Sequence, residues 1–388
     1  MRTRLFSALL LAMLCHVALA APDLTASEAG LGKSIEAIRN NRLDLALNEV
    51  DSVLRINPNF RLAQLIRGDL LMARAGAISN IGSGANAPRD KLDDLRAEAR
   101  ARLLRMQAQP NQKIAPRFLW QLDAAQKYAL VVDTSRSTLY VYENVSGTAR
   151  YVADYYITIG KLGTEKRAEG DQRTPIGVYF VKADLPKAQL ADMYGSGAFP
   201  LSYPNEWDKK NNRTGQGIWL HGTPSDTYSR PPRASNGCVV LSNDNLEKVR
   251  PYLQVGVTPV IITNHMESFS GVDNDNRDEL RAAMEQWRKD WSSLNTRAYL
   301  SHYSADFASD NQNYSAWAAQ KTLVNAGKEW AKVKVSNVSM FTYPEQPDMV
   351  VVNFEQDYAS NNLSNQMHKR QYWIKQNNHW KILYEGAA

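Results

Sequence analysis

The sequence is poor in cysteine, with only Cys15 and Cys238 among its 388 residues. It has no compact run of lysine and arginine with interleaved aromatic residues, the pattern typical of a nucleic-acid-binding surface. Beyond the first twenty residues it lacks an apolar run of the roughly 18 to 20 residues that a membrane-spanning helix needs. These absences argue against a disulfide framework, a nucleic-acid partner and a polytopic membrane protein.

The N-terminus has the pattern of a secretory signal peptide. Arg2 and Arg4 precede the apolar run Leu5–Val17, and small residues follow up to Ala20. We therefore expect residues 1–20 to be removed after Ala20 and the mature protein to reside in the periplasm or cell envelope; an uncleaved N-terminal anchor is the alternative. Removal lowers the formal net charge from +6 to +4, because two arginines are lost, and leaves Cys238 as the only cysteine.

Residues 21–115 are predicted to form a helical domain. From about Ala26 to Arg74 apolar residues recur at spacings of three and four, interrupted by Asn57-Pro58-Asn59. The run Ala46 to Leu70 resembles a tetratricopeptide-type repeat. It is too short for a free-standing solenoid, so we expect it to dock on itself, on the next domain or on a second copy. A partner-binding role and a plain helical hairpin are both open.

Residues 120–265 are predicted to form a mostly β domain. Short alternating or apolar runs begin at Tyr128 and are separated by turn signals such as Thr174-Pro175-Ile176-Gly177. One helix is expected at about Asn243 to Leu253, with Asp244 in its first turn.

Residues 275–386 are predicted to form a third domain of the α+β class. Helices are expected at Asp278–Trp291 and Tyr299–Phe307. Strand-like runs follow at Ala331–Tyr343, Asp348–Tyr358, Gln366–Lys375 and His379–Tyr384. Helices followed by a curled antiparallel sheet make a cone that encloses a pocket.

The single exported thiol is a candidate nucleophile. A free thiol titrates near ~8.5, so at neutral pH only a few per cent is thiolate unless a base or a positive field intervenes. His221 is the only histidine in the body of the β domain and is therefore the candidate base for Cys238.

Two ordered motifs carry a family resemblance. Ile218-Trp219-Leu220-His221-Gly222-Thr223, followed after a long loop by Ser235-Asn236-Gly237-Cys238-Val239-Val240-Leu241-Ser242, resembles the active-site signature of the L,D-transpeptidase (YkuD-type) catalytic domain. The upstream segments Ile159-Gly160-Lys161, Gly170-Asp171 and Arg173-Thr174-Pro175 resemble the first half of that domain. The resemblance implies a β-rich fold in which Cys238 attacks a peptidoglycan stem tetrapeptide and releases D-alanine.

The resemblance also implies roles for neighbouring groups. The carbonyl of Gly222 would orient the His221 ring. The backbone N–H groups of Asn236, Gly237 and Cys238 are expected to form an oxyanion hole, worth on the order of 10²-fold or more in rate per donor.

Substrate contacts are expected from Ser235 and from Arg233, whose guanidinium suits a stem-peptide carboxylate. No Cys/His spacing for structural zinc is present, so we expect no metal and no cofactor.

The motif departs from the common family pattern at two positions. Asn236 stands where the family usually has His, and Val240 where it has Arg or Asn, so the choice of acyl acceptor is open. The third domain resembles the nuclear-transport-factor-like (SnoaL-like) cone of cell-shape L,D-carboxypeptidases. Transpeptidation to an amine is the first expectation and carboxypeptidase trimming the second.

A non-catalytic wall-binding scaffold is a further alternative, although a scaffold needs neither the thiol nor the imidazole. The expected partners are peptidoglycan stem peptides, with a glycan or peptide in the C-terminal pocket and a protein partner or second copy on the N-terminal helices as hypotheses.

Overall fold

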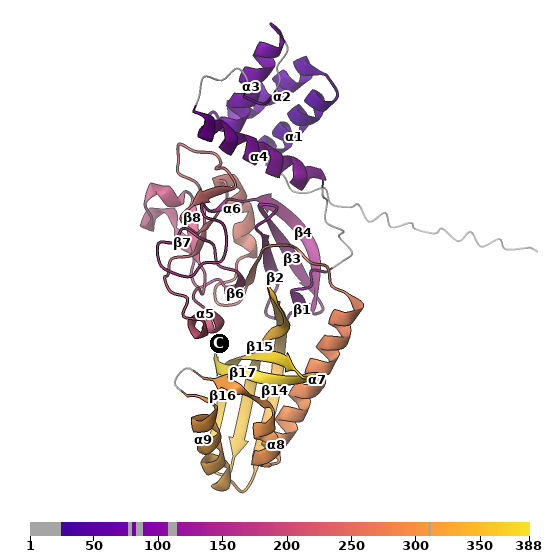
Figure 1. Cartoon of the computed structure of the whole chain (residues 1–388), viewed down its shortest axis with the longest axis vertical. Helices are drawn as coiled ribbons and strands as arrows, with labels where there is room; N and C mark the ends of the chain where they lie inside the picture. The colour runs from indigo at the N-terminus through magenta and orange to yellow at the C-terminus, as the bar shows by residue number, and fades with distance from the viewer. Residues whose placement is uncertain (1–24, 77–79, 83–87, 108–114, 310–311) are drawn as a thin grey trace, which may run out of the picture.

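The computed structural model describes residues 25–76, 80–82, 88–107, 115–309 and 312–388. Figure 1 shows a helical unit at one end of the long axis, a β-rich unit in the middle and a unit of helices on a sheet at the other end. This is the multidomain layout expected from the sequence. The predicted signal peptide lies outside the described residues. No helix in the described ranges is both long and apolar enough to cross a bilayer.

The helical unit is built from α1 (Ala26–Arg39), α2 (Leu43–Ile56), α3 (Arg61–Ala73) and α4 (Arg89–Gln107). The Thr25 side chain caps α1 by accepting the Glu28 N–H at 3.2 Å. The apolar core of this unit also contains Tyr228 from the β-rich unit. Of the docking alternatives, the structure shows docking on the following domain.

The β-rich unit contains a five-stranded sheet in the order β4-β3-β2-β12-β6, a four-stranded sheet β11-β9-β8-β7 and the pair β10-β5. Its strands are β2 (Tyr128–Asp133), β3 (Thr138–Val145), β4 (Thr148–Tyr156), β5 (Ile159–Gly160), β6 (Gly177–Phe180), β7 (Leu185–Pro186), β8 (Gly197–Pro200), β9 (Trp219–His221), β10 (Arg233–Ser235), β11 (Val239–Val240) and β12 (Pro259–Thr263). The helices α5 (Glu206–Lys210) and α6 (Asn243–Val249) complete it. Aliphatic and aromatic side chains from these sheets and α6 form one buried core, which fixes the strands that carry the motifs.

The C-terminal unit packs helices on a six-stranded sheet in the order β1-β14-β15-β16-β17-β13. Its strands are β1 (Leu119–Gln121), β13 (Tyr303–Ala308), β14 (Ala331–Tyr343), β15 (Gln346–Ser360), β16 (Ser364–Gln376) and β17 (His379–Ala387). Its helices are α7 (Gly271–Ser292), α8 (Thr296–Ser301) and α9 (Tyr314–Ala326). Aromatic side chains fill the space between helices and sheet, as expected.

The predicted helix Tyr299–Phe307 is wrong in its second half. α8 ends at Ser301, and Tyr303 begins β13, which pairs in parallel with β17. Tyr299, Tyr303 and Phe307 are all buried at a spacing of four residues, which imitates a helical stripe. The partner strand decides the conformation here, because it satisfies the backbone groups of residues 303–308 in a sheet.

The β-rich and C-terminal units share a packed interface. Phe180 lies 6.0 Å from Phe341, centroid to centroid, and the Arg370 guanidinium lies 4.5 Å above the Phe180 ring. Arg370 also pairs with Glu206 of α5 at 3.2 Å. Because aromatic, cation–π and ionic contacts coincide at this interface, the two units are held in a fixed relation.

Candidate active site

Two neighbouring parallel strands position the segments that carry His221 and Cys238. β11 pairs with β9 so that Val240 stands opposite His221. Cys238 directly precedes β11 and lies two residues before Val240. Because side chains alternate along extended backbone, we expect the Cys238 side chain on the same side as that of His221.

The His221 ring is held in one orientation. Its Nδ1 lies 2.7 Å from the carbonyl oxygen of Gly222, so the neutral ring donates from Nδ1 and keeps Nε2 free to accept a proton. The Gly222 N–H in turn donates to the Tyr194 carbonyl at 3.0 Å. Asn243 braces the same turn, because its Nδ2 donates to the Thr223 carbonyl at 2.9 Å. A Cβ on Gly222 would lie 2.1 Å from the Asn243 Oδ1, so a larger residue here would displace the Asn243 side chain.

The surroundings of His221 keep its imidazole neutral. The side chain is buried, with the Tyr194 ring packed edge-on against it at 5.2 Å. This burial lowers the pKa of His221 from 6.5 to about 4, opposed by the Gly222 hydrogen bond and assisted by the positive charge of Arg230. At neutral pH the ring is therefore unprotonated and able to act as a base.

Cys238 is a free, half-buried thiol. Its Sγ donates to the Gly217 carbonyl at 3.3 Å. Burial raises the pKa of the thiol, while a hydrogen bond from the Trp219 backbone and the charges of Lys166 and Arg230 act in the opposite direction. Since burial prevails, the resting form is a neutral thiol, and a base is required to generate the nucleophile.

The turn before Cys238 is held by its own hydrogen bonds. The Ser235 hydroxyl donates to the Cys238 carbonyl at 2.6 Å and accepts the Gly237 N–H at 3.1 Å. The Thr174 hydroxyl donates to the Gly237 carbonyl at 2.9 Å. Gly237 has φ +123°, and a Cβ there would lie 2.7 Å from the Arg173 carbonyl oxygen. Only glycine fits this backbone without strain.

These contacts already engage two groups for which roles toward the substrate were expected. The Ser235 hydroxyl bonds within the turn, and the Gly237 N–H donates to it. A substrate contact of Ser235 stays a prediction. Within residues 115–309 the structure shows no acceptor for the N–H groups of Asn236 and Cys238. These two amides are the donors that remain for an oxyanion.

Arg233, the expected contact for a substrate carboxylate, is not among the cations that act on the thiol. Arg233 is exposed on β10. Arg230 instead acts on the pKa of both Cys238 and His221. The sequence did not indicate that Arg230 acts on both groups, and it did not reveal Lys166, whose buried Nζ is held by Asp171 at 2.8 Å.

The described residues contain no group of three or more His, Cys, Asp or Glu side chains arranged to hold a metal ion. The side chains and backbone groups described at this site offer a thiol, an imidazole and backbone amides. This combination suits acyl transfer.

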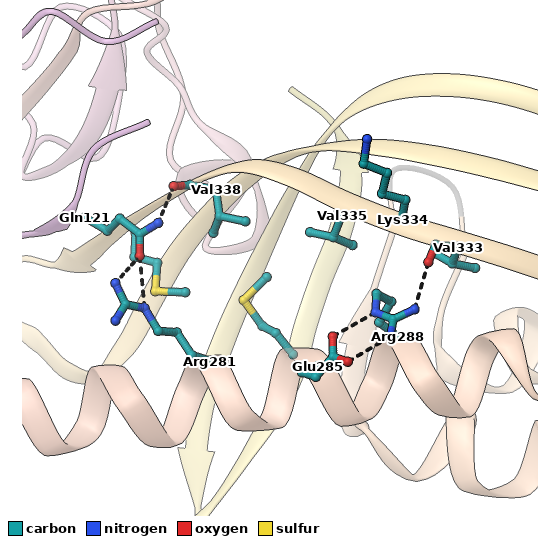
Figure 2. A pocket seen from close by; sticks show the side chains of 10 residues that line it. Gln121, Arg281, Glu285, Arg288, Val333, Lys334, Val335 and Val338 are labelled. Carbon is teal, nitrogen blue, oxygen red and sulfur yellow. Dashed lines mark hydrogen bonds and ion pairs between the residues drawn. The ribbon is translucent and has the colours of Figure 1, made fainter. Parts of the chain in front are cut away.

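A pocket of 410 Å³ lies in the C-terminal unit, between α7 and β14 (Figure 2). Its polar side chains contact one another and the strand backbone. Arg281 Nη2 donates to Gln121 Oε1 at 2.5 Å, and Gln121 Nε2 donates to the Val338 carbonyl at 2.8 Å. Arg288 pairs with Glu285 at 2.7 Å. A glycan or peptide ligand of this unit stays a prediction.

Comparison with known proteins places the β-rich and C-terminal units. A family model described as the L,D-transpeptidase catalytic domain (YkuD) matches residues 127–262, and one described as the Cds6 C-terminal NTF2-like domain matches residues 279–386. No curated protein sequence matches the chain.

Solved structures match over the same large part of the chain. Bd1075 of Bdellovibrio bacteriovorus is 30% identical, with a TM-score of 0.62, over 71% of this chain and 98% of that one. The helical cell shape determining protein Pgp2 of Campylobacter jejuni is 27% identical, with a TM-score of 0.61, over 71% of this chain and 96% of that one. Both family models leave out the N-terminal helical unit. The chain belongs to the family that joins an L,D-transpeptidase (YkuD-type) catalytic domain to a Cds6-type NTF2-like C-terminal domain.

Proposed function

We propose that the protein is a cysteine-dependent L,D-acyltransferase that cleaves the meso-diaminopimelate–D-alanine bond of peptidoglycan stem tetrapeptides. The observation that supports this proposal is the parallel pairing of β9, which carries a neutral His221 oriented by Gly222, with β11, which begins directly after Cys238. Family membership supports the reaction class. The predicted signal peptide supports action in the periplasm, where peptidoglycan is located.

The chemistry begins with transfer of the thiol proton to Nε2 of His221. The Sγ of Cys238 turns from the Gly217 carbonyl and attacks the scissile carbonyl carbon, and the oxygen takes up negative charge. The N–H groups of Asn236 and Cys238 stabilise this oxyanion. The C–N bond then breaks, and His221 returns the proton to the amine of the departing D-alanine. A thioester on Cys238 remains.

The acyl acceptor completes the cycle by attacking the thioester and giving its proton to His221, which reprotonates the leaving thiolate. An amine of a neighbouring stem yields a 3-3 crosslink, the broader activity of the family. Water yields a tripeptide. Similarity to a helical cell shape determining protein over 71% of this chain supports hydrolysis, with water as the acceptor, as the second candidate reaction.

Product analysis tests the proposal. We expect purified protein incubated with disaccharide tetrapeptide to release D-alanine, and mass spectrometry to distinguish tripeptide monomers from 3-3 dimers. Cys238→Ala and His221→Ala should each abolish release, whereas His265→Ala, at an exposed histidine, should retain it. Wild-type turnover in either active-site variant contradicts the proposal. If the wild-type protein releases no D-alanine and forms no adduct with a carbapenem, the result supports the alternative of a non-catalytic wall-binding scaffold.

A further inference from the structure

The N-terminal helical unit packs on the loop that joins His221 to Cys238. Tyr228 of this loop is buried against Phe60, with ring centroids 4.4 Å apart. Its hydroxyl lies 3.3 Å from the Thr25 Oγ1. The next residue, Ser229, donates its hydroxyl to Glu98 of α4 at 2.7 Å. The helical unit therefore packs directly on the loop that connects the two candidate catalytic residues.

A buried ion-pair cluster stabilises this contact between the helical unit and the loop. Arg102 of α4 is 2% exposed, pairs with Glu28 at 2.6 Å and Glu98 at 2.9 Å, and lies 4.1 Å above the Tyr156 ring. The Tyr156 hydroxyl donates to the Arg230 carbonyl at 2.9 Å. Contacts thus run from α4 through Tyr156 to the loop at Arg230. The facing surfaces of α4 and of the loop are therefore held in place before any ligand binds.

A cavity of 610 Å³ lies between these surfaces. The helical unit contributes Arg61 and Lys91 to its lining, and the β-rich unit contributes Lys161, Arg230 and Arg233. Within the described ranges, none of these five cations forms an ion pair or a side-chain hydrogen bond.

The carboxylates in the lining do not balance these cations. Glu98 is already bonded to Arg102 and Ser229, and only Asp94 remains. The cavity therefore presents an excess of uncompensated positive charge, which favours an anionic ligand.

The cavity is lined by the loop that leads to Cys238. Arg233 begins β10, which ends at Ser235, three residues before Cys238 in the sequence. Arg230 lines the cavity and also acts electrostatically on Cys238. A ligand in the cavity would therefore contact the segment that carries the candidate nucleophile.

We propose that this cavity is a substrate subsite, in which cations of the helical unit and of the loop bind carboxylates of the peptidoglycan stem outside the scissile bond. The proposal rests on the proposed function, since that function supplies the acidic peptide. It assigns the N-terminal helices a direct part in substrate binding. A guanidinium or ammonium on each side of the cavity suits a peptide that carries several carboxylates.

The test replaces the two cations of the helical unit, which lie far in sequence from the motifs. Arg61→Gln with Lys91→Gln should raise the KM for disaccharide tetrapeptide roughly fivefold to tenfold and leave kcat within about twofold, because partly exposed charge pairs contribute modestly and only to binding. Arg100→Gln, at an exposed position on the same helix α4, is the matched control and should match the wild type. Amidation of the stem carboxylates should remove the difference between variant and wild type.

Binding to the Cys238→Ala protein separates this inference from the proposed function. Calorimetry with the same muropeptide should give a Kd that rises by the same factor in the double variant, with a difference that shrinks at 0.5 M salt, about where screening becomes strong. If the wild type releases no D-alanine, the proposed function falls, and this Kd comparison still decides the subsite. A double variant that binds as tightly as the Arg100→Gln control, or an absence of muropeptide binding, overturns the inference.

Discussion

The acid limit of activity provides the sharpest prediction. Burial lowers the pKa of His221 from 6.5 to about 4, so protonating the ring in the folded protein is disfavoured by about 3 kcal/mol relative to water. Below its pKa the imidazolium cannot accept the thiol proton. We therefore expect kcat/KM for D-alanine release to stay level from neutral pH down to about pH 5 and to fall through about pH 4.

The Tyr194 ring gives a means of moving this limit. It packs edge-on against His221 at 5.2 Å and is part of the wall that excludes water. Tyr194→Ala should admit water, stabilise the imidazolium and shift the acid limb upward by about one pH unit. Tyr194→Phe retains the ring and should leave the limb in place. The backbone carbonyl that accepts the Gly222 N–H is present in both variants.

The assay is the pH dependence of kcat/KM between about pH 3.5 and 8, combined with an NMR titration of the His221 ring in the Cys238→Ala protein. The NMR titration reports the imidazole pKa without contribution from chemistry or product release. An acid limb near the ordinary histidine value of about 6.5 in the wild type would refute the reasoning. So would equal shifts in Tyr194→Ala and Tyr194→Phe.

Three further predictions concern stability. Gly237→Ala should lower the free energy of unfolding, measured by thermal unfolding, by about 1–3 kcal/mol, because the residue has φ +123° and its Cβ would lie 2.7 Å from a backbone carbonyl oxygen. The control Gly256→Ala, at a position with positive φ but open space around the Cβ, should lower it less. Arg102→Ala should lower the free energy of unfolding by about 3–5 kcal/mol, because it leaves two buried carboxylates without their partner. It should also make the helical unit sensitive to limited proteolysis, whereas the control Arg100→Ala should not. Equal cleavage of the two variants would contradict this prediction. The His221 side chain binds a proton at about pH 6.5 in the unfolded state and only at about pH 4 in the folded state. The free energy of unfolding therefore decreases as the pH is lowered from about 6.5 to about 4. His221→Gln should therefore be free of about 3 kcal/mol of acid destabilisation, and a wild-type slope retained in the variant would refute it.

The sequence indicated a candidate nucleophile and a candidate base because both lie in short ordered motifs, and β9 and β11 form at those motifs. The groups that tune the site are spread along the chain. Lys166 and Asn243 reach it from separate loops and helices, and their places depend on how the sheets pack. No local pattern in a single sequence carries that information, since such contacts arise from tertiary structure.

Elements were predicted best where one periodicity was sustained. The strand β14 runs from Ala331 to Tyr343 as expected, because a long alternating run has few other solutions. Residues 303–308 were assigned wrongly because four-residue spacing of aromatic residues fits both a helix and a strand that packs under helices. The burial of Arg102 on α4 was equally hidden, since this residue reads in sequence as an ordinary surface charge.

The departures from the family motif acquire a physical meaning in the structure. Val240 is buried and forms reciprocal backbone hydrogen bonds with Thr158 at 2.9 Å, so its side chain serves packing and brings no charge to the thiol. Positive charge near Cys238 comes instead from Lys166 and Arg230, which act from two other loops. Arg230 belongs to the loop that the helical unit clamps. The field at the nucleophile therefore depends on the docking of a unit that both family models leave out, and loss of that docking should weaken thiol activation along with substrate binding.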